Sequence, residues 1–152
     1  MADGFEITGS QDLARAAKAL KDAGDGELRK ELARRVRDAA KSAIPDVRQA
    51  AREKLPRSGG LGERVADQAY AVRATYAAAG ATVKITGRGM KGLQSIDEGH
   101  VRHPVFGNRD TWVQQEVEAG FFSETISGHA PTIRKGIENA VDDVCHRVDR
   151  SV

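Results

Sequence analysis

Residues 100–122 read HVRHPVFGNRDTWVQQEVEAGFF, and this stretch holds the only tryptophan and three of the four phenylalanines of the 152-residue chain. Aromatic residues make up only 5% of the sequence. Because large, rigid side chains dominate the energetics of cores and interfaces, we expect the chain to make its specific contacts here. The stretch is predicted to form a loop over residues 100–108 and then a strand over Thr111–Val117. Its contacts serve either chemistry or assembly.

The composition is that of one domain with a small core. A chain of 152 residues is predicted to form a single domain, residues 1–152. Leu, Ile, Val and Phe supply about a fifth of the residues, which is near the lower limit for a chain that folds by burying apolar surface. Because such a core is thin, part of the apolar surface is expected to be buried against partner molecules.

The charge balance and the cysteine content set further bounds. The 24 basic and 22 acidic residues leave a net charge of +2, and no region forms the basic stripe that a phosphate backbone requires. Cys145 is the only cysteine, which excludes an intrachain disulfide and is compatible with a reducing cytosol. No apolar run is long enough for a signal peptide or a membrane span, so no membrane partner is expected.

Residues 10–55 are predicted to be helical. Apolar residues at helical spacing indicate a short helix that is capped by Ser10 and stopped by Gly24. A second apolar stripe, over residues 27–55, indicates a longer helix whose remaining surface is charged. Pro45 interrupts this stripe, and because proline inside a helix removes a hydrogen bond, a kink or a restart is expected there.

Residues 63–118 are predicted to form a small antiparallel sheet. An alternating pattern favours a strand over residues 69–77, and residues 82–86 read as a second strand that pairs with it in a hairpin. Residues 93–96 are predicted to be a third short strand, and residues 1–9 have a strand-like alternation.

The remaining pattern predicts a C-terminal helix over residues 123–149, since apolar residues recur at helical spacing from Ile126 to Val148. Pro131 is expected at a kink or in the true first turn of this helix. Long N-terminal helices, a small antiparallel sheet with a hairpin, and a final helix together indicate the α+β class.

Possible metal ligands are His100-x-x-His103 and the pair Cys145-His146. Their spacing fits none of the common zinc frameworks, and adjacent residues on a helix point about 100° apart, so no metal is expected. Cys145 also lies beside the apolar stripe of the last helix. A thiol in that position is expected to be buried and inert, not an activated nucleophile.

Two further segments contain residue types that could serve catalysis. Asp97-Glu98 could be paired catalytic acids, but adjacent acids on a polar turn are expected to be solvated. The glycine-rich residues 87–92 lack the spacing of the common phosphate-binding loops and read as a connector. An enzyme that uses this glycine-rich segment is therefore the weakest hypothesis, and we predict no catalytic residue, no metal and no cofactor.

The residues from Arg29 to Lys41 carry a run of basic side chains. The interleaved acids Glu27, Glu31 and Asp38 favour a solvated helix face with local ion pairs. An alternative function follows from the same run, because an oligomer could concentrate modest charge on one surface. That alternative is a small cytoplasmic nucleic-acid-binding regulator.

Several segments occur in an order that resembles a known family. LPRSGGL at Leu55–Leu61 follows the long helical region, and RHPVFGN at Arg102–Asn108 follows the predicted hairpin. Trp112 and the GFF of Gly120–Phe122 then lead into the last helix. In this order, over residues 26–150, the chain resembles the head–tail connector family of long-tailed bacteriophages, also described as neck, tail-completion or minor capsid proteins.

The resemblance implies a structural virion protein without catalysis, with a fold like that of tail-terminator proteins. It implies a ring of identical subunits, expected to be a hexamer, which joins the portal side to the tail around the DNA channel. The implied partners are other copies of the chain, the adjacent head-completion and tail-tube proteins, and passing genomic DNA that is bound without sequence specificity. The implied location is the virion, and the host cytoplasm during assembly.

The predicted interface residues all come from the opening stretch. They are His103, Pro104, Phe106, Asn108, Trp112, Phe121 and Phe122. We expect them to contact the adjacent subunit or the next ring, because aromatic residues are frequent interface hot spots. The alternative is that Trp112, Phe121 and Phe122 form the core of the subunit itself.

Overall fold

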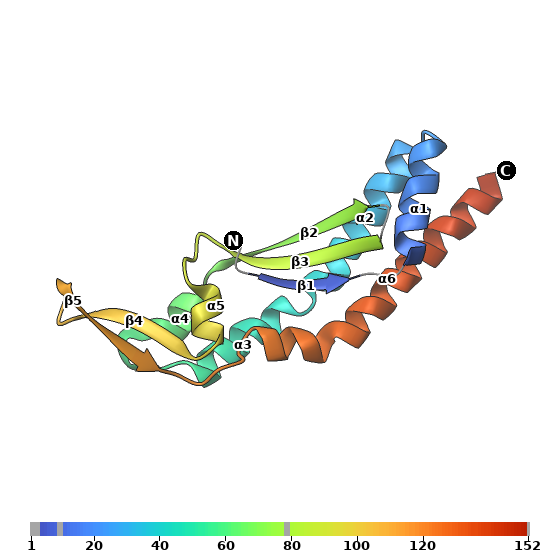
Figure 1. Ribbon diagram of the computed structural model, residues 1–152. Helices are drawn as coiled ribbons and strands as arrows, with labels where there is room; N and C mark the ends of the chain where they lie inside the picture. The colour runs from blue at the N-terminus through green and yellow to red at the C-terminus, as the bar shows by residue number, and fades with distance from the viewer. Residues whose placement is uncertain (1–3, 9–10, 78–79, 152) are drawn as a thin grey trace. The chain divides into compact units, whose positions relative to one another are not determined.

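The computed structural model describes residues 4–8, 11–77 and 80–151, and it confirms the α+β class (Figure 1). The elements are, in chain order, β1 (Gly4–Thr8), α1 (Gln11–Asp22), α2 (Gly26–Lys41), α3 (Ile44–Lys54), the 3-10 helix η1 (Ser58–Gly60), α4 (Leu61–Ala66), β2 (Ala69–Ala77), β3 (Gly80–Arg88), α5 (Leu93–Asp97), β4 (His100–Val105), β5 (Asn108–Glu116) and α6 (Ser123–Ser151). Most of the predicted helices and strands are therefore present.

The chain divides into two compact units, each built from separate stretches of sequence. The hairpin unit contains Ala43–Tyr70 and Thr86–Gly128, with the start of β1. The helical unit contains Glu6–Ser42, Ala71–Ile85 and the chain from His129 onward. Since β2, β3 and α6 each run from one unit into the other, neither unit matches one of the contiguous regions predicted from the sequence. The single domain stays a prediction.

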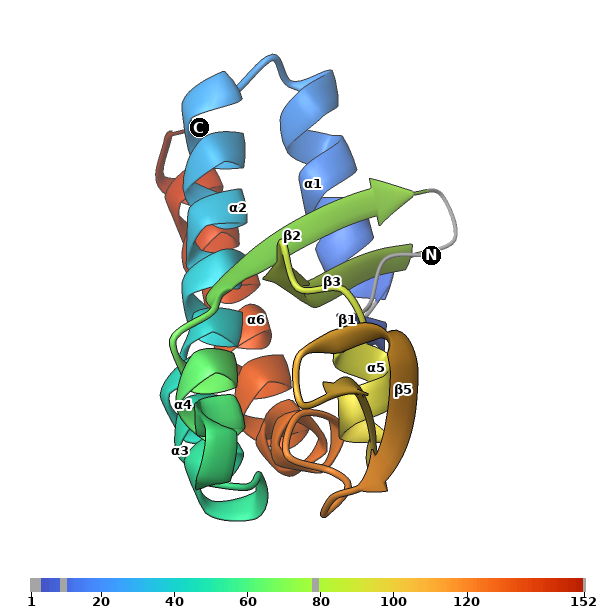
Figure 2. The same ribbon diagram turned by 90° about the vertical axis from the view of Figure 1, so that its left-hand side faces the viewer.

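The first two helices lie side by side within the helical unit (Figure 2). Helix α1 confirms the predicted short helix, and its predicted cap, Ser10, lies outside the described residues. Asp25 begins α2, because its carboxylate accepts a hydrogen bond of 3.0 Å from the backbone N–H of Leu28. This contact satisfies one of the free N–H groups at the start of the helix. The buried residues of α2 are Leu32, Val36 and Ala40.

The predicted break at Pro45 is a restart between two helices. Helix α2 ends at Lys41, and α3 begins at Ile44 with Pro45 in its first turn. Proline is tolerated there because the first N–H groups of a helix have no partner inside the helix. The apolar stripe over residues 27–55 therefore belongs to two helices, and they lie in different units.

The strands β1, β2 and β3 form one sheet in the order β1-β3-β2. The predictions of a strand over residues 69–77, a strand over 82–86 and a strand-like start are confirmed. The residues that join β2 to β3, 78–79, lie outside the described residues. Val72, Val83 and Ile85 are buried, so these strands contribute to the core.

The prediction of a strand over residues 93–96 is wrong, because these residues form the short helix α5. Leu93 and Ile96 are three positions apart and share one helix face, on which Leu93 is buried. The turn ends at Gly99, whose φ is +96° and whose N–H donates to the carbonyl of Ile96. A Cβ at position 99 would lie 2.9 Å from the carbonyl oxygen of Val117, so only glycine fits without displacement.

Helix α6 confirms the predicted C-terminal helix, and Pro131 lies inside it, beyond the first turn. Cys145 was predicted to be buried, and this is wrong because its side chain is exposed. Its neighbour Val144 is buried, and consecutive helix residues point about 100° apart. Of the helices described, none is both long and apolar enough to cross a membrane.

Candidate interaction site

The predicted loop over residues 100–108 is mostly a strand. His100–Val105 forms β4, which pairs antiparallel with β5 so that Arg102 faces Gln114 and Pro104 faces Trp112. Proline is accommodated because this sheet has only two strands, so each strand has an outer edge that needs no ladder hydrogen bond. The segment HPVFGN is therefore the end of a β-hairpin and its turn.

The hairpin turn consists of Phe106 and Gly107, which lie between the paired residues Val105 and Asn108. Both central residues have positive φ, +47° for Phe106 and +78° for Gly107. This is the pattern of a type I′ turn, whose twist matches that of the flanking strands. The side-chain oxygen of Asn108 accepts a 2.9 Å hydrogen bond from the N–H of Asp110 and supports the turn. Glycine suits the second central position of such a turn, where φ is positive.

Phe106 is an unusual residue for its place in the turn. Asn, Asp or Gly usually occupies the first central position of a type I′ turn, and a left-handed backbone costs other L-residues about 1–2 kcal/mol. The Phe106 side chain is fully exposed, at 104% of its reference area, so burial within the chain does not offset this cost. Strain of this kind is often retained at positions that serve function.

Trp112 is held in place while 46% of its surface stays exposed. Its indole N–H donates a 2.7 Å hydrogen bond to the carbonyl oxygen of Arg109. The guanidinium carbon of Arg102 lies 5.5 Å from the centre of its ring, within the range of a cation–π attraction. A fixed, half-exposed indole is suited to binding because little conformational freedom is lost on contact.

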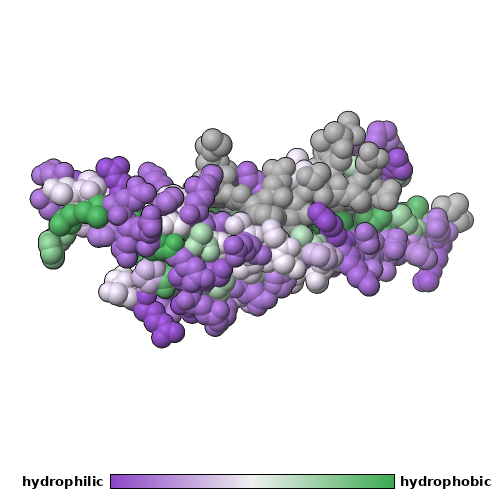
Figure 3. All heavy atoms as spheres, turned by 60° about the horizontal axis from the view of Figure 1, so that its bottom comes forward, coloured by the Kyte–Doolittle hydropathy of each residue, from purple (hydrophilic) through white to green (hydrophobic). Residues whose placement is uncertain are grey.

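The exposed apolar residues of this hairpin form what we call the tip surface, defined as Phe106, Trp112 and Val113. Figure 3 shows hydrophobic atoms gathered at this end of the hairpin. Trp112 and Val113 are consecutive in β5 and so point to opposite faces. All nine residues of β5 are exposed, so neither face of this strand is buried by the described chain.

Two other predicted interface residues lie beside the tip surface. His103 is exposed and pairs with Val113, and its ring nitrogen Nδ1 lies 3.2 Å from the carbonyl oxygen of Pro104. Pro104 is half-buried opposite Trp112. The structure therefore brings together five of the seven predicted residues at one end of the hairpin, and these are His103, Pro104, Phe106, Asn108 and Trp112.

Phe121 and Phe122 lie elsewhere, in the core of the hairpin unit. They are 0% and 3% exposed, and the ring of Tyr70 stacks on Phe122 at a centroid distance of 6.0 Å. This is the alternative that the sequence left open for these side chains. Burial raises the pKa of Tyr70 to about 12, while the charge of Arg48 opposes the rise.

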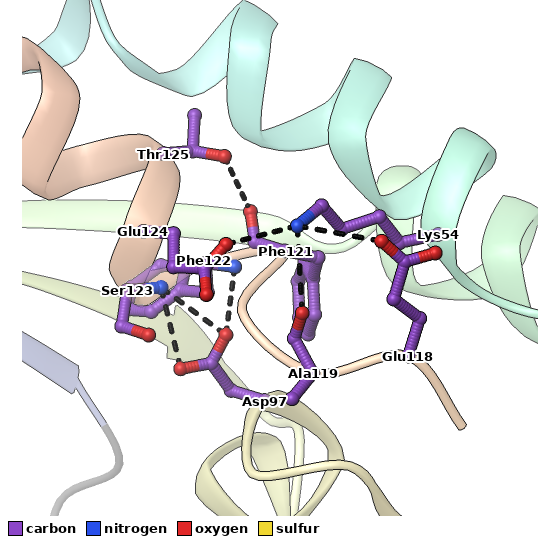
Figure 4. Close-up of polar contacts among 9 residues, drawn as sticks. All are labelled: Lys54, Asp97, Glu118, Ala119, Phe121, Phe122, Ser123, Glu124 and Thr125. Atoms are coloured by element: carbon purple, nitrogen blue, oxygen red, sulfur yellow. Dashed lines mark hydrogen bonds and ion pairs between the residues drawn. The ribbon is translucent and has the colours of Figure 1, made fainter.

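The base of the hairpin is fastened by Asp97, as Figure 4 shows. Its carboxylate accepts hydrogen bonds from the N–H groups of Phe122, at 2.8 Å, and Ser123, at 3.1 Å. Its carbonyl oxygen accepts a third from Gly120, at 2.8 Å. A carboxylate at the start of α6 also complements the helix dipole. Asp97 was expected to be solvated, and no pattern in the sequence shows that it caps a helix 26 residues later.

Lys54 of α3 ties the same segment from the other side (Figure 4). Its ammonium lies 3.0 Å from a carboxylate oxygen of Glu124 and 3.6 Å from one of Glu118. It also donates to the carbonyl of Ala119 at 3.4 Å. The hydrogen bond to Glu124 is the main reason that the pKa of Lys54 is raised. The hairpin thus has a fixed base and an uncovered tip.

The candidate chemical residues are not brought together. His100 and His103 lie on opposite faces of β4, since they are an odd number of positions apart, and His100 Nδ1 lies 3.3 Å from the side-chain nitrogen of Gln114. Cys145 and His146 belong to the other unit. Within the described part of the chain, no group of three or more His, Cys, Asp or Glu residues could hold a metal ion.

The basic run of α2 contains both paired and solvent-facing side chains. Arg35 donates to Asp143 and pairs with Glu31 at 3.1 Å, and Arg147 pairs with Glu31 at 2.6 Å. The pairs Arg35–Asp143 and Arg147–Glu31 join α2 to α6 within the helical unit. The exposed basic residues that recur at helical spacing, which we call the α2 basic row, are Lys30, Arg34, Arg37 and Lys41.

Comparisons of the chain with protein-family models, with curated proteins and with solved structures gave no match.

Proposed function

We propose that the chain is a structural subunit of the head–tail junction of a long-tailed bacteriophage. Copies of it form a ring, expected to be a hexamer, between the portal side and the tail. Head-completion and tail-tube proteins are its neighbours, and the genome passes through the channel without sequence-specific binding. The chain assembles in the host cytoplasm and resides in the virion.

The observation that carries this proposal is the uncovered tip surface on a fixed base. An isolated two-stranded hairpin is at best marginally stable in water, yet β4 and β5 extend with every residue of β5 exposed. Burying one large apolar side chain stabilises a complex by about 1.5–3 kcal/mol. Contact with a partner would stabilise the exposed hairpin and would offset the backbone strain at Phe106.

The fixed base supports the same function. Asp97 and Lys54 hold the base of the hairpin, through the segment that follows β5 and the start of α6. The tip is therefore presented in one orientation, which lowers the entropy that binding costs. A repeated, directional contact of this kind is what closed rings of identical subunits require.

The proposal is tested by the mass and the shape of the purified chain. Native mass spectrometry and electron microscopy should show closed rings with a central channel, and purified tailed particles should contain the chain. Trp112→Ala should weaken ring formation about 30-fold, as expected for a hot spot, with the fold intact. Unfolding of Trp112→Ala would place Trp112 in the core, and absence of the chain from the particles would overturn the proposal.

A second candidate function is nucleic-acid binding through the α2 basic row. The observation that favours it is that Lys30, Arg34, Arg37 and Lys41 are exposed and recur at helical spacing. If each neutralised one phosphate, the logarithm of duplex affinity should fall with the logarithm of salt at a slope of about −3.6. Arg34→Gln with Arg37→Gln should then halve the slope, while binding that is absent at low salt would remove this candidate.

A further inference from the structure

A second exposed apolar feature lies in the helical unit, between α1 and the C-terminal part of α6. It is a groove of about 130 Å³. Its apolar lining consists of Ala16, Ala19 and Leu20 from α1 and Val144, Cys145 and Val148 from α6. Among the residues whose side chains the structure describes, Asp149 is the one charged residue that lines it.

We propose that this groove receives Phe106 from a second copy of the chain. The inference rests on the proposed function, since it names the contact that joins neighbouring subunits of the ring. The tip surface of one copy is then the projecting side of the interface, and the groove of the next copy is the receiving side.

The size of the groove matches the side chain that would enter it. A cavity of about 150 Å³ lined by aliphatic and aromatic residues takes up one benzene molecule, and the groove has 130 Å³. The phenyl ring of Phe106 projects from a two-residue turn with no described side chain covering it, so it can enter without rearrangement. Val148 is 36% exposed, and the inserted ring would cover part of this exposed surface.

The charges around the two features are complementary. Arg102 and Arg109 flank the tip surface, and both are exposed. Asp149 lines the groove and makes no ion pair with any other described residue. A guanidinium beside the inserted ring can therefore pair with this carboxylate, and such pairing fixes register more than it adds affinity.

The arrangement has a consequence for symmetry. In a ring the contact is heterologous, with each copy using its tip on one neighbour and its groove on the other. Heterologous contacts that close generate rings, whereas a self-complementary contact would stop at a dimer.

The sole cysteine makes the contact directly testable, because Cys145 is exposed and lines the groove. The variant Asn108→Cys places a second thiol two positions past Phe106 and keeps the phenyl ring. It loses the hydrogen bond to the N–H of Asp110, so its unfolding is measured in parallel with that of the wild type. On oxidation, a disulfide should form between position 108 of one copy and position 145 of another. Mixing isotope-labelled with unlabelled chains identifies it, because a link between copies then joins peptides of different mass. Gln49→Cys, at an exposed position on α3, is the matched control and should form none.

Two further variants keep the test decisive. Phe106→Asp in the Asn108→Cys background should reduce the yield of the link at least about 30-fold, as for loss of a hot spot. Ala19→Trp, which fills the groove from an exposed position, should do the same, while Ala23→Trp, exposed but outside the groove, should not.

The outcomes separate this inference from the proposed function. Rings without the 108–145 link, or with a link only inside one chain, overturn the groove contact and leave the ring function standing. A chain that forms neither rings nor links overturns both.

Discussion

The aromatic residues of the segment 100–122 behave in opposite ways at its two ends. At the GFF end, Phe121 and Phe122 are buried and Tyr70 stacks on one of them. At the hairpin tip, Phe106 is fully exposed in a left-handed turn and Trp112 is half-exposed. Aromatic rings 9 to 16 positions apart in sequence thus belong to the subunit's own core in one case and to an uncovered surface in the other.

This difference shows that aromatic clustering in a sequence does not by itself identify an interface. The decisive property is the backbone that carries each ring. Phe121 and Phe122 sit where Asp97 folds the chain back into α6, so their rings turn inward. Phe106 sits in a two-residue turn with no chain beyond it to pack against.

The largest expected effect is at the buried end. Phe121→Ala should lower the free energy of unfolding by roughly 3–5 kcal/mol, as for other large-to-small core changes. Chemical denaturation of the monomeric chain measures it. Phe106→Ala is the matched control and should change the free energy by less than about 0.5 kcal/mol. Equal losses of stability in the two variants would contradict the assignment of Phe121 to the core and of Phe106 to the surface.

The next effect concerns the anchor between the two ends. Asp97→Ala removes the acceptor for the N–H groups of Phe122 and Ser123, and it should cost about 0.5–2 kcal/mol. Its neighbour Glu98 is exposed, and among the described residues its side chain bonds only Gln94 of α5, so Glu98→Ala should have little effect. Amide hydrogen exchange should quicken at Phe122 and Ser123 in the Asp97 variant alone, and unchanged exchange would contradict the capping role.

A smaller effect depends on pH. The pKa of Tyr70 is about 12 in the folded chain and about 10 in the unfolded chain. Stability from this group is therefore complete below about pH 10 and is lost as the pH rises towards about 12. The denaturation midpoint should fall over this range relative to that of Tyr70→Phe. Parallel curves for the two proteins would mean that Tyr70 is not buried against Phe122.

The smallest expected change is a gain in stability, whereas the changes above are losses. Phe106→Asn places a residue that favours the left-handed region in the turn, and it should stabilise the folded chain by up to about 1 kcal/mol. Thermal unfolding measures the change. Asn108→Ala serves as the contrast, because it removes the hydrogen bond to Asp110 and should destabilise the same turn. A loss of stability in Phe106→Asn would mean that the ring packs within the subunit.

Much of the fold follows from sequence patterns, and the exceptions have local physical causes. The helices, the strands over residues 69–77 and 82–86, and the break at Pro45 follow from apolar spacing and from the missing N–H of proline. The segment Leu93–Ile96 is an exception, because a short apolar run suits either a strand or one helical turn. Here burial of Leu93 and the end of the turn at Gly99 decide for the helix.

The candidate site was predicted only in part. The sequence identifies the stretch with Phe106 and Trp112, but it does not separate them from Phe121 and Phe122, because burial depends on contacts with distant residues such as Asp97 and Tyr70. The groove between α1 and α6 escaped prediction for the same reason. Its two sides are more than a hundred residues apart in the chain.

The central claim is that the strained, exposed Phe106 exists for contact between copies. Sedimentation of the wild-type chain and of Phe106→Asn, at equal concentration and with unfolding measured in parallel, tests it most directly. We predict an oligomer for the wild type, and a monomer for the variant that is at least as stable as the wild-type fold. Unchanged oligomerisation of a stably folded Phe106→Asn chain would contradict the claim.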